Sequence, residues 1–190
     1  MNLPRSSLQS GFTLIELLVS ITLTLLLVSG IGAAFIAIKQ TVRDVNHFEN
    51  AQDVLRSSRH MLNYSIKRAS AATIQSVDQV QTLVLQQSNS QDCTGRPQTT
   101  AFTEQFRIQS AELQCRVIVA GVTGAWTPLI TGIHALDFQL TANNRLVRFR
   151  ISPQNLPGQY PTADLNNDQQ LEPYVRLDIA LKSIILAEAT

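Results

Sequence analysis

The sequence predicts an α+β protein, in which one long N-terminal α-helix is followed by an antiparallel β-sheet. Two patterns indicate this class. An apolar run near the N-terminus continues into a stripe of apolar residues with helical period, and beyond Ser76 the apolar period changes to two. With 190 residues, the chain is long enough for one membrane-spanning helix and one modest hydrophobic core.

The apolar run extends from Leu17 to Ile38 without a charged side chain, although charged residues make up 15% of the whole chain. A helix that rises about 1.5 Å per residue would extend roughly 33 Å over this run, which is enough to cross the hydrocarbon core of a bilayer. We therefore predict a transmembrane helix over residues 12–38. The flanking charges, Arg5 before the run and Lys39 and Arg43 after it, do not decide its orientation.

One carboxylate, Glu16, stands at the beginning of this apolar segment, in the string Gly-Phe-Thr-Leu-Ile-Glu over residues 11–16. A carboxylate in hydrocarbon is costly, so it needs a partner and indicates a functional position. The polar leader before it does not have the order of a secretory signal. The small residue Gly11 precedes the apolar run, and no small-residue cleavage site follows the run.

The string GFTLIE, with its short polar leader and the apolar helix after it, resembles the class III signal of type IV prepilins and pseudopilins. The resemblance implies that a prepilin peptidase cleaves between Gly11 and Phe12, so that residues 1–11 are a leader peptide. It also implies that the new amine of Phe12 is N-methylated and pairs with Glu16 of the same or an adjacent subunit. An ordinary signal anchor with a chance glutamate is the alternative.

The same resemblance implies a location and a set of partners. The protein would cross the inner membrane once, with its C-terminal domain in the periplasm, and would then enter a pilus or pseudopilus. The expected partners are the prepilin peptidase/methylase and other major and minor pilins or pseudopilins, which pack through the N-terminal helix. The inner membrane is the partner before assembly.

The helix is predicted to continue over residues 39–75 as an amphipathic segment that packs on a sheet. Apolar residues recur there at spacings of three, four and seven, and no proline interrupts residues 12–70. The apolar stripe consists of Val42, Val45, Phe48, Ala51, Leu55, Leu62, Ile66 and Ala69.

A second and looser resemblance lies in the stretch Phe-Ile-x-x-Lys-Gln-x-x-Arg over residues 35–43 and in the amphipathic segment after it. These features resemble the PilW-like minor pilins, which are low-abundance subunits of the type IV pilus. The J-type minor pseudopilins of type II secretion share the architecture and are the alternative family.

Residues 76–190 are predicted to form an antiparallel β-sheet domain. Short segments in which apolar and polar residues alternate are separated there by Gly, Pro, Asn and Ser, which is typical of strands with one buried face. The six segments are Leu83 with Leu85, Phe106 with Ile108, Leu113 to Val119, Leu136 to Leu140, Val147 to Ile151, and Val175 to Leu181.

The two cysteines, Cys93 and Cys115, are too few to define a disulfide framework, but they are compatible with one disulfide in an oxidising compartment. Because the resemblance places this domain in the periplasm, we predict the disulfide. Two free thiols are the alternative.

One loop late in the chain carries oxygen-bearing side chains at alternating positions, as the first part of an EF-hand calcium loop does. Two positions depart from that pattern, because Gln169 stands where glycine is needed and Val175 stands where a bidentate glutamate is needed. We predict a polar loop between strands and no resident cofactor, with Ca²⁺ binding as the alternative. The residues concerned are Asp164, Asn166, Asp168, Gln170 and Glu172.

Arg148 and Arg150 share one face of a predicted strand and could contact DNA phosphates, which makes nucleic acid an alternative partner. A solvated strand face that is balanced by nearby carboxylates is the favoured interpretation, and a formal net charge of +1 does not favour nucleic acid. The histidines, His47, His60 and His134, lack the spacing of metal ligands.

The sequence contains no nucleophile motif, paired acid and base, or phosphate loop, so we predict a protein that is not an enzyme but a substrate of the peptidase and methylase. The favoured function is a minor pilin that contributes to pilus assembly or initiation and to pilus-dependent motility, adhesion or DNA uptake. The alternatives are a J-type minor pseudopilin of a type II secretion system and a pilus-associated subunit that binds DNA or a surface.

Overall fold

The computed structural model describes residues 13–141, 145–157, 159–166 and 168–181. The predicted leader, with Gly11 and Phe12, lies outside these residues. The chain divides into two compact units, one up to Val45 and the other from Asn46 onward, and each is considered by itself.

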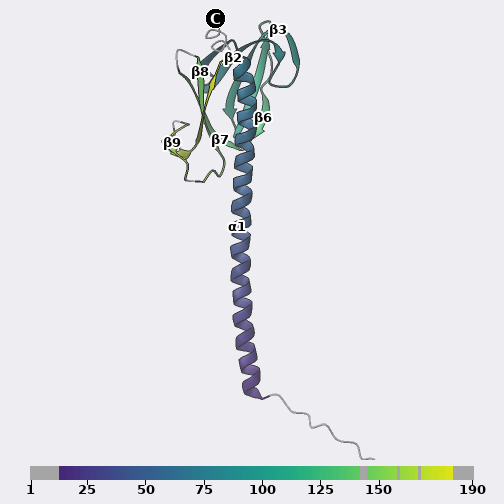
Figure 1. Cartoon of the computed structure of the whole chain (residues 1–190), viewed down its shortest axis with the longest axis vertical. Helices are drawn as coiled ribbons and strands as arrows, with labels where there is room; N and C mark the ends of the chain where they lie inside the picture. The colour runs from purple at the N-terminus through teal and green to yellow at the C-terminus, as the bar shows by residue number, and fades with distance from the viewer. Residues whose placement is uncertain (1–12, 142–144, 158, 167, 182–190) are drawn as a thin grey trace, which may run out of the picture. The chain divides into compact units, whose positions relative to one another are not determined.

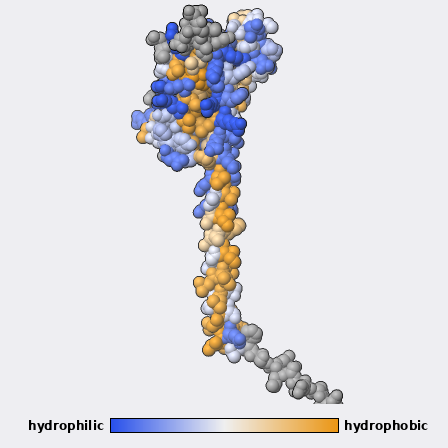
Figure 2. All heavy atoms as spheres, viewed as in Figure 1, coloured by the Kyte–Doolittle hydropathy of each residue, from blue (hydrophilic) through white to orange (hydrophobic). Residues whose placement is uncertain are grey.

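The first unit is helical over its described residues. Helix α1 begins at Leu14 and continues into the second unit, where it ends at Arg68 (Figure 1). Up to Val45 its side chains are exposed, and Figure 2 shows hydrophobic side chains all along this part of the helix. By length and composition α1 can cross a membrane. An apolar surface of this extent is compatible with lipid or with the apolar surfaces of other helices.

In the second unit, α1 packs on the strands through one face. Ala51, Leu62 and Ile66 are buried, while Val42 and Val45 of the predicted stripe are exposed. The helix ends at Arg68, before the predicted end at residue 75, and a strand begins at Ala71. The reason lies at Ser70, whose backbone N–H (2.9 Å) and hydroxyl (3.2 Å) both donate to the carbonyl oxygen of Gln86 and start a strand pairing.

The strands form two larger antiparallel sheets and one small one. The main sheet has the order β1-β2-β3-β4-β5, with β6 also paired to β4, and the second sheet has the order β11-β8-β7. The main sheet contains β1 (Ala71–Val77), β2 (Val80–Gln91), β3 (Pro97–Gln109), β4 (Glu112–Val119), β5 (Val122–Thr123) and β6 (Thr127–Thr131). The second sheet contains β7 (Ile133–Thr141), β8 (Leu146–Pro153) and β11 (Val175–Ala180), and β9 (Thr162–Ala163) pairs with β10 (Glu172–Pro173).

The α+β fold class is therefore confirmed, with a layout that fits the pilin-like fold. All six predicted strand segments lie in strands, namely β2, β3, β4, β7, β8 and β11, although Leu181 follows the last residue of β11. Most of β1 falls within the residues predicted as helix, so it was not predicted as a separate strand.

Two tight hairpin turns in the main sheet are made without glycine. Asp78 and Gln79 have φ values of 54° and 64°, and they join β1 to β2 with Val77 opposite Val80. Ser110 and Ala111 join β3 to β4 in the same way. Two successive residues with positive φ match the right-handed twist of the strands. Asp-Gln and Ser-Ala are not the glycine-containing pairs that usually signal such a turn in a sequence.

The two larger sheets are joined by one side chain as well as by a shared core. The Nε2 atom of Gln81 on β2 donates to the carbonyl oxygen of Phe138 (3.0 Å), and its Oε1 atom accepts the N–H of Phe138 (2.8 Å). The core beneath combines α1 residues with large side chains of both sheets, among them Phe106 and Phe149.

Replacing Ile66 by valine tests the helix–sheet packing. Ile66 is fully buried, so the loss of one methylene should lower the free energy of unfolding of the second unit by about 0.5–1.5 kcal/mol. The measurement is urea unfolding of the full chain in detergent. Val45→Ala is the control, because Val45 is 49% exposed and its truncation should change stability by less than about 0.5 kcal/mol. Equal effects of the two changes would contradict the packing described here.

Candidate assembly site

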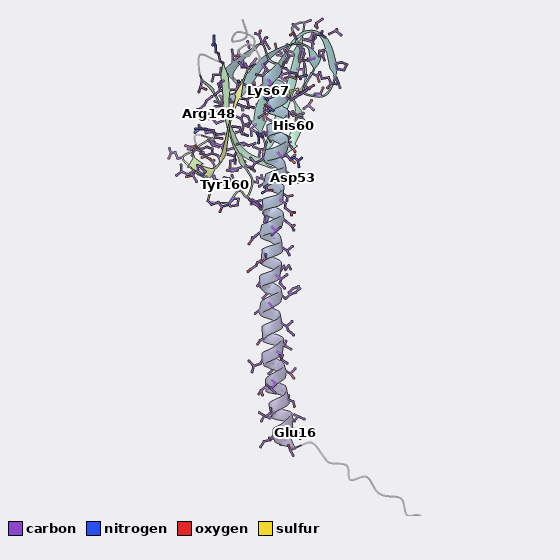
Figure 3. The ribbon with its side chains drawn as sticks, in the orientation of Figure 1. Glu16, Asp53, His60, Lys67, Arg148 and Tyr160 are labelled. Atoms are coloured by element: carbon purple, nitrogen blue, oxygen red, sulfur yellow. A yellow bond between two sulfur atoms is a disulfide. The ribbon has the colours of Figure 1, made fainter. Side chains whose placement is uncertain are left out.

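The first turn of α1 holds Glu16, the carboxylate that the sequence analysis selected (Figure 3). The Thr13 hydroxyl accepts the N–H of Glu16 (3.3 Å), and the Glu16 carboxylate accepts the backbone N–H (3.5 Å) and hydroxyl (3.4 Å) of Thr13. This reciprocal pair is a capping box, in which the cap residue and the third helical residue satisfy each other's backbone groups. The spacing Thr-x-x-Glu is its sequence signal, which the sequence analysis did not use.

The capping bonds of Glu16 are long, and its side chain is exposed. A carboxylate has about four acceptor positions, so Glu16 can receive a further donor without leaving the helix. Phe12 lies outside the described residues, and the pairing of its amine with Glu16 stays a prediction.

Hydroxyl side chains within the apolar part of α1 are satisfied by the helix itself. Ser20 donates to the carbonyl oxygen of Glu16 (2.7 Å), Thr24 to that of Ser20 (2.7 Å), and Ser29 to that of Leu26 (2.8 Å). Such bonds hide polar groups from an apolar surrounding, so these residues do not prevent the helix from entering hydrocarbon.

Gly30 and Gly32 leave open space on the surface of α1. A Cβ atom added at either position would meet nothing within 4 Å in this chain. The fold of the single chain therefore does not require glycine there. Small residues on an apolar helix allow the backbone of another helix to approach closely, which identifies this stretch as a candidate contact with a neighbouring helix.

Cys93 and Cys115 form a disulfide in the structure, with Cα atoms 6.6 Å apart. Cys115 lies on β4, and Cys93 lies in the loop between β2 and β3, so the bond fastens that loop to the sheet. Asp92 in the same loop accepts hydrogen bonds from Thr94, Arg96 and Gln98. These bonds hold the pKa of Asp92 below its usual value even though partial burial acts to raise it.

The oxygen-rich loop uses its carboxylates to hold its own backbone. Asp164 accepts the N–H groups of Asp168 (3.1 Å) and Gln169 (3.0 Å), and Gln169 has a φ of 66°, so it adopts the conformation usually given to glycine. Glu172 accepts the N–H of Leu165 and the side-chain amide of Asn166, both at 3.1 Å. Among the described residues, no three His, Cys, Asp or Glu side chains are placed to hold a metal ion. Calcium binding, the alternative to a polar loop, is not tested by these contacts.

Arg148 and Arg150 on β8 are both paired with carboxylates on the neighbouring strands. Arg148 contacts both carboxylate oxygens of Asp178 on β11, at 2.8 and 3.1 Å, and its hydrogen bonds hold the pKa of Asp178 below its usual value. Arg150 pairs with Asp137 on β7, where its Nε and Nη2 groups both donate to the Oδ2 atom. The balancing carboxylates that the sequence analysis expected are therefore present, and they lower the positive charge that this face offers to a phosphate.

An open groove of about 650 Å³ lies between α1 and β6 and contains the residue types of a hydrolytic triad, Asp53, Ser57 and His60. Figure 3 labels two of them, Asp53 and His60, on α1. The side-chain hydrogen bonds of the described residues do not link any two of the three, whereas a triad requires the base to bond both the nucleophile and the acid. We assign no catalytic role to this groove. The other two histidines are exposed, and His134 lies 3.7 Å from Glu172.

Glu104 is a titratable residue in the core that the sequence analysis did not single out. It is fully buried on β3, and burial raises its pKa against the lowering effects of hydrogen bonding with Gln87, Ser65 and the backbone of Cys93 and of the positive charge of Arg68. A signal for it was present, because Phe102, Glu104 and Phe106 occupy alternate positions and therefore lie on the same face of a strand.

Comparison with known proteins supports the pilin-like class of protein that the long apolar helix and Glu16 in its first turn indicate. Residues 6–32 match the family model described as the prokaryotic N-terminal methylation motif, and the matched segment includes Gly11, Phe12 and Glu16. No curated protein matches the chain. The motif and the α+β layout together support a type IV pilin- or pseudopilin-like protein with an N-terminal transmembrane helix. The motif is one of structural subunits and not of an enzyme family.

Proposed function

We propose that this chain is a PilW-like minor pilin, a subunit of a type IV pilus that contributes to pilus assembly or initiation. The observation that carries the proposal is the methylation motif over residues 6–32, which includes the beginning of the exposed apolar part of α1. In this proposal, a prepilin peptidase cleaves after Gly11, and the methylated amine of Phe12 begins the mature chain. Motility, adhesion or DNA uptake would then depend on the pilus.

Two features of α1 support an assembly role for its N-terminal part. The exposed apolar side chains need a partner, which is the inner membrane before assembly and other pilin helices afterwards. Gly30 and Gly32 offer a place for close approach of a second helix. Glu16 then meets the Phe12 amine of the same or an adjacent subunit. This buried ion pair would specify the register of the incoming subunit more than it would add stability.

The disulfide supports a periplasmic location for the second unit. Disulfides form and persist in oxidising compartments such as the bacterial periplasm and are rare in the cytosol. With residues 1–11 on the cytoplasmic side and Cys93 and Cys115 in the periplasm, the chain crosses the membrane once.

Replacing Glu16 by valine separates maturation from assembly. Gly11 and Phe12 are unchanged in this variant, so we expect normal cleavage and N-methylation. The variant lacks the carboxylate that pairs with the amine, so its amount in purified filaments should fall at least about tenfold. Quantitative immunoblotting of membrane and filament fractions measures both steps. Glu49→Val is the matched control, because Glu49 is another exposed carboxylate on α1 but lies outside the motif. Wild-type incorporation of Glu16→Val would refute the pairing.

A clean deletion of the gene distinguishes the pilus from the secretion machinery. We expect loss of surface pili with normal levels of secreted enzymes in the medium. Loss of secretion with normal pili would instead identify a J-type minor pseudopilin, which shares the fold and the maturation. The stretch Phe-Ile-x-x-Lys-Gln-x-x-Arg over residues 35–43 favours the first result.

A further inference from the structure

Glu104 lies on the core side of β3 among apolar side chains. Phe102 and Phe106 are its neighbours on the same face of the strand, and Leu85 on β2 and Val117 on β4 are its direct partners across the sheet. Glu104 is fully buried. A charged carboxylate in such a place is unfavourable unless several donors compensate it.

The hydrogen bonds around Glu104 are incomplete for an ionised carboxylate. The Nε2 group of Gln87 donates to the backbone carbonyl oxygen of Ser65 (2.7 Å) and to Oε2 of Glu104 (2.9 Å). Oε1 of Glu104, Oε1 of Gln87 and Oγ of Ser65 are buried without a well-formed hydrogen bond. The Ser65 hydroxyl and the backbone N–H of Cys93 lie near Glu104 and act to lower its pKa, but burial outweighs them. An ionised carboxylate can only accept hydrogen bonds, whereas a protonated one supplies a donor for one of these oxygens.

Arg68 is the charged group that acts on Glu104, and it is engaged elsewhere. Its guanidinium donates to the carbonyl oxygens of Gln91 (2.7 Å) and Tyr64 (3.2 Å) and stacks on the Tyr64 ring. Gln87 and Arg68 together therefore tie the last turns of α1 to β2, and Glu104 extends this network to β3. The network therefore connects α1, β2 and β3 around the carboxyl group of Glu104.

We propose that Glu104 is uncharged in the folded protein and acts as a pH-sensitive latch for the C-terminal end of α1. Ionisation of Glu104 would leave a buried negative charge with one well-formed hydrogen bond, from Gln87, and the least costly relief is to admit water by lifting the end of α1 from β2 and β3. Burial raises the pKa of Glu104, so the latch is fully closed below the unfolded pKa of an ordinary glutamate. Its contribution to stability is lost as the pH rises through the folded pKa.

The test measures amide hydrogen exchange of the full chain in detergent at pH 5 and pH 8, expressed as protection factors so that the intrinsic pH dependence of exchange is removed. We expect protection of the amides from Ser65 to Arg68 to fall between pH 5 and pH 8, by about tenfold for each unit by which the folded pKa of Glu104 exceeds about 5. Glu104→Gln has the same shape and no charge, so it should keep high protection at both pH values. Glu112→Gln, a carboxylate on β4, should behave like wild type.

Several outcomes would overturn the latch. One is a Glu104→Gln variant that keeps the pH dependence of wild type, and another is a loss of protection that is equal throughout the second unit. Carboxyl ¹³C chemical shifts of the wild-type chain provide a measurement that does not depend on the variant folding. Titration of Glu104 with an ordinary glutamate pKa would also refute the proposal, whereas a raised pKa together with local opening at α1 supports it.

Discussion

Replacing Gly11 by valine is expected to leave every molecule uncleaved, with residues 1–11 still attached. The class III signal places a small residue immediately before the cut, and a β-branched side chain there should not fit the peptidase. Without cleavage the Phe12 amine is never formed, so neither N-methylation nor pairing with Glu16 can follow. The measurement is intact-mass spectrometry of the chain after co-expression with a prepilin peptidase. Wild type should begin with N-methylated Phe12.

Gly11→Ala is the matched control for this experiment, because alanine keeps a small side chain at the cut and should still be processed. A Gly11→Val chain with the mass of the mature protein would contradict the assignment of cleavage between Gly11 and Phe12. Uncleaved wild type would do the same, and it would favour an ordinary signal anchor with a chance glutamate at position 16.

Removing the disulfide by changing both Cys93 and Cys115 to alanine is expected to lower the free energy of unfolding of the second unit by about 2–5 kcal/mol. The two residues are 22 apart in the sequence, so the cross-link limits the freedom of a substantial loop in the unfolded chain. Cys115 is also buried in the core, which adds a small packing loss. Urea unfolding of the full chain in detergent measures the difference.

Reduction of the wild-type chain with dithiothreitol provides the comparison for the double variant. Reductant should shift the wild-type urea midpoint towards that of the variant and should leave the variant unchanged. A wild-type midpoint that does not respond to reductant would show either that the bond is absent or that it contributes nothing to stability.

Periodicity alone was sufficient to predict most of the secondary structure. The strand segments around Leu113 to Val119 and Val147 to Ile151 were clear because each has one buried face, and this asymmetry appears as alternation. β1 was missed because Ala71 and Ala72 continue the apolar spacing of Ile66 and Ala69. The change from helix to strand is decided by the hydrogen bond from Ser70 to Gln86, a contact between residues that are distant in the sequence.

The candidate assembly site was predictable because its signal is local. Gly11, Phe12 and Glu16 lie within one short string, and the match to the methylation motif covers the same string. The capping box of Thr13 and Glu16 is equally local in the sequence, but it indicates the beginning of the helix and not the cleavage signal. By contrast, the surroundings of Glu104 depend on Ser65 and Gln87, which only the fold brings together, and the order of the strands depends on long-range pairing that no local pattern reports.

Gln81 also has a consequence for substitutions at the line where the two sheets meet. Its side-chain amide both accepts from and donates to the backbone of Phe138, so it imitates one peptide group of an additional strand. Glutamate has the right length but cannot donate when ionised, leucine can do neither, and asparagine is one methylene too short. Gln81 thus links the two sheets through a pair of hydrogen bonds that, among these residue types, only glutamine can make, and this position should tolerate less variation than its polar character suggests.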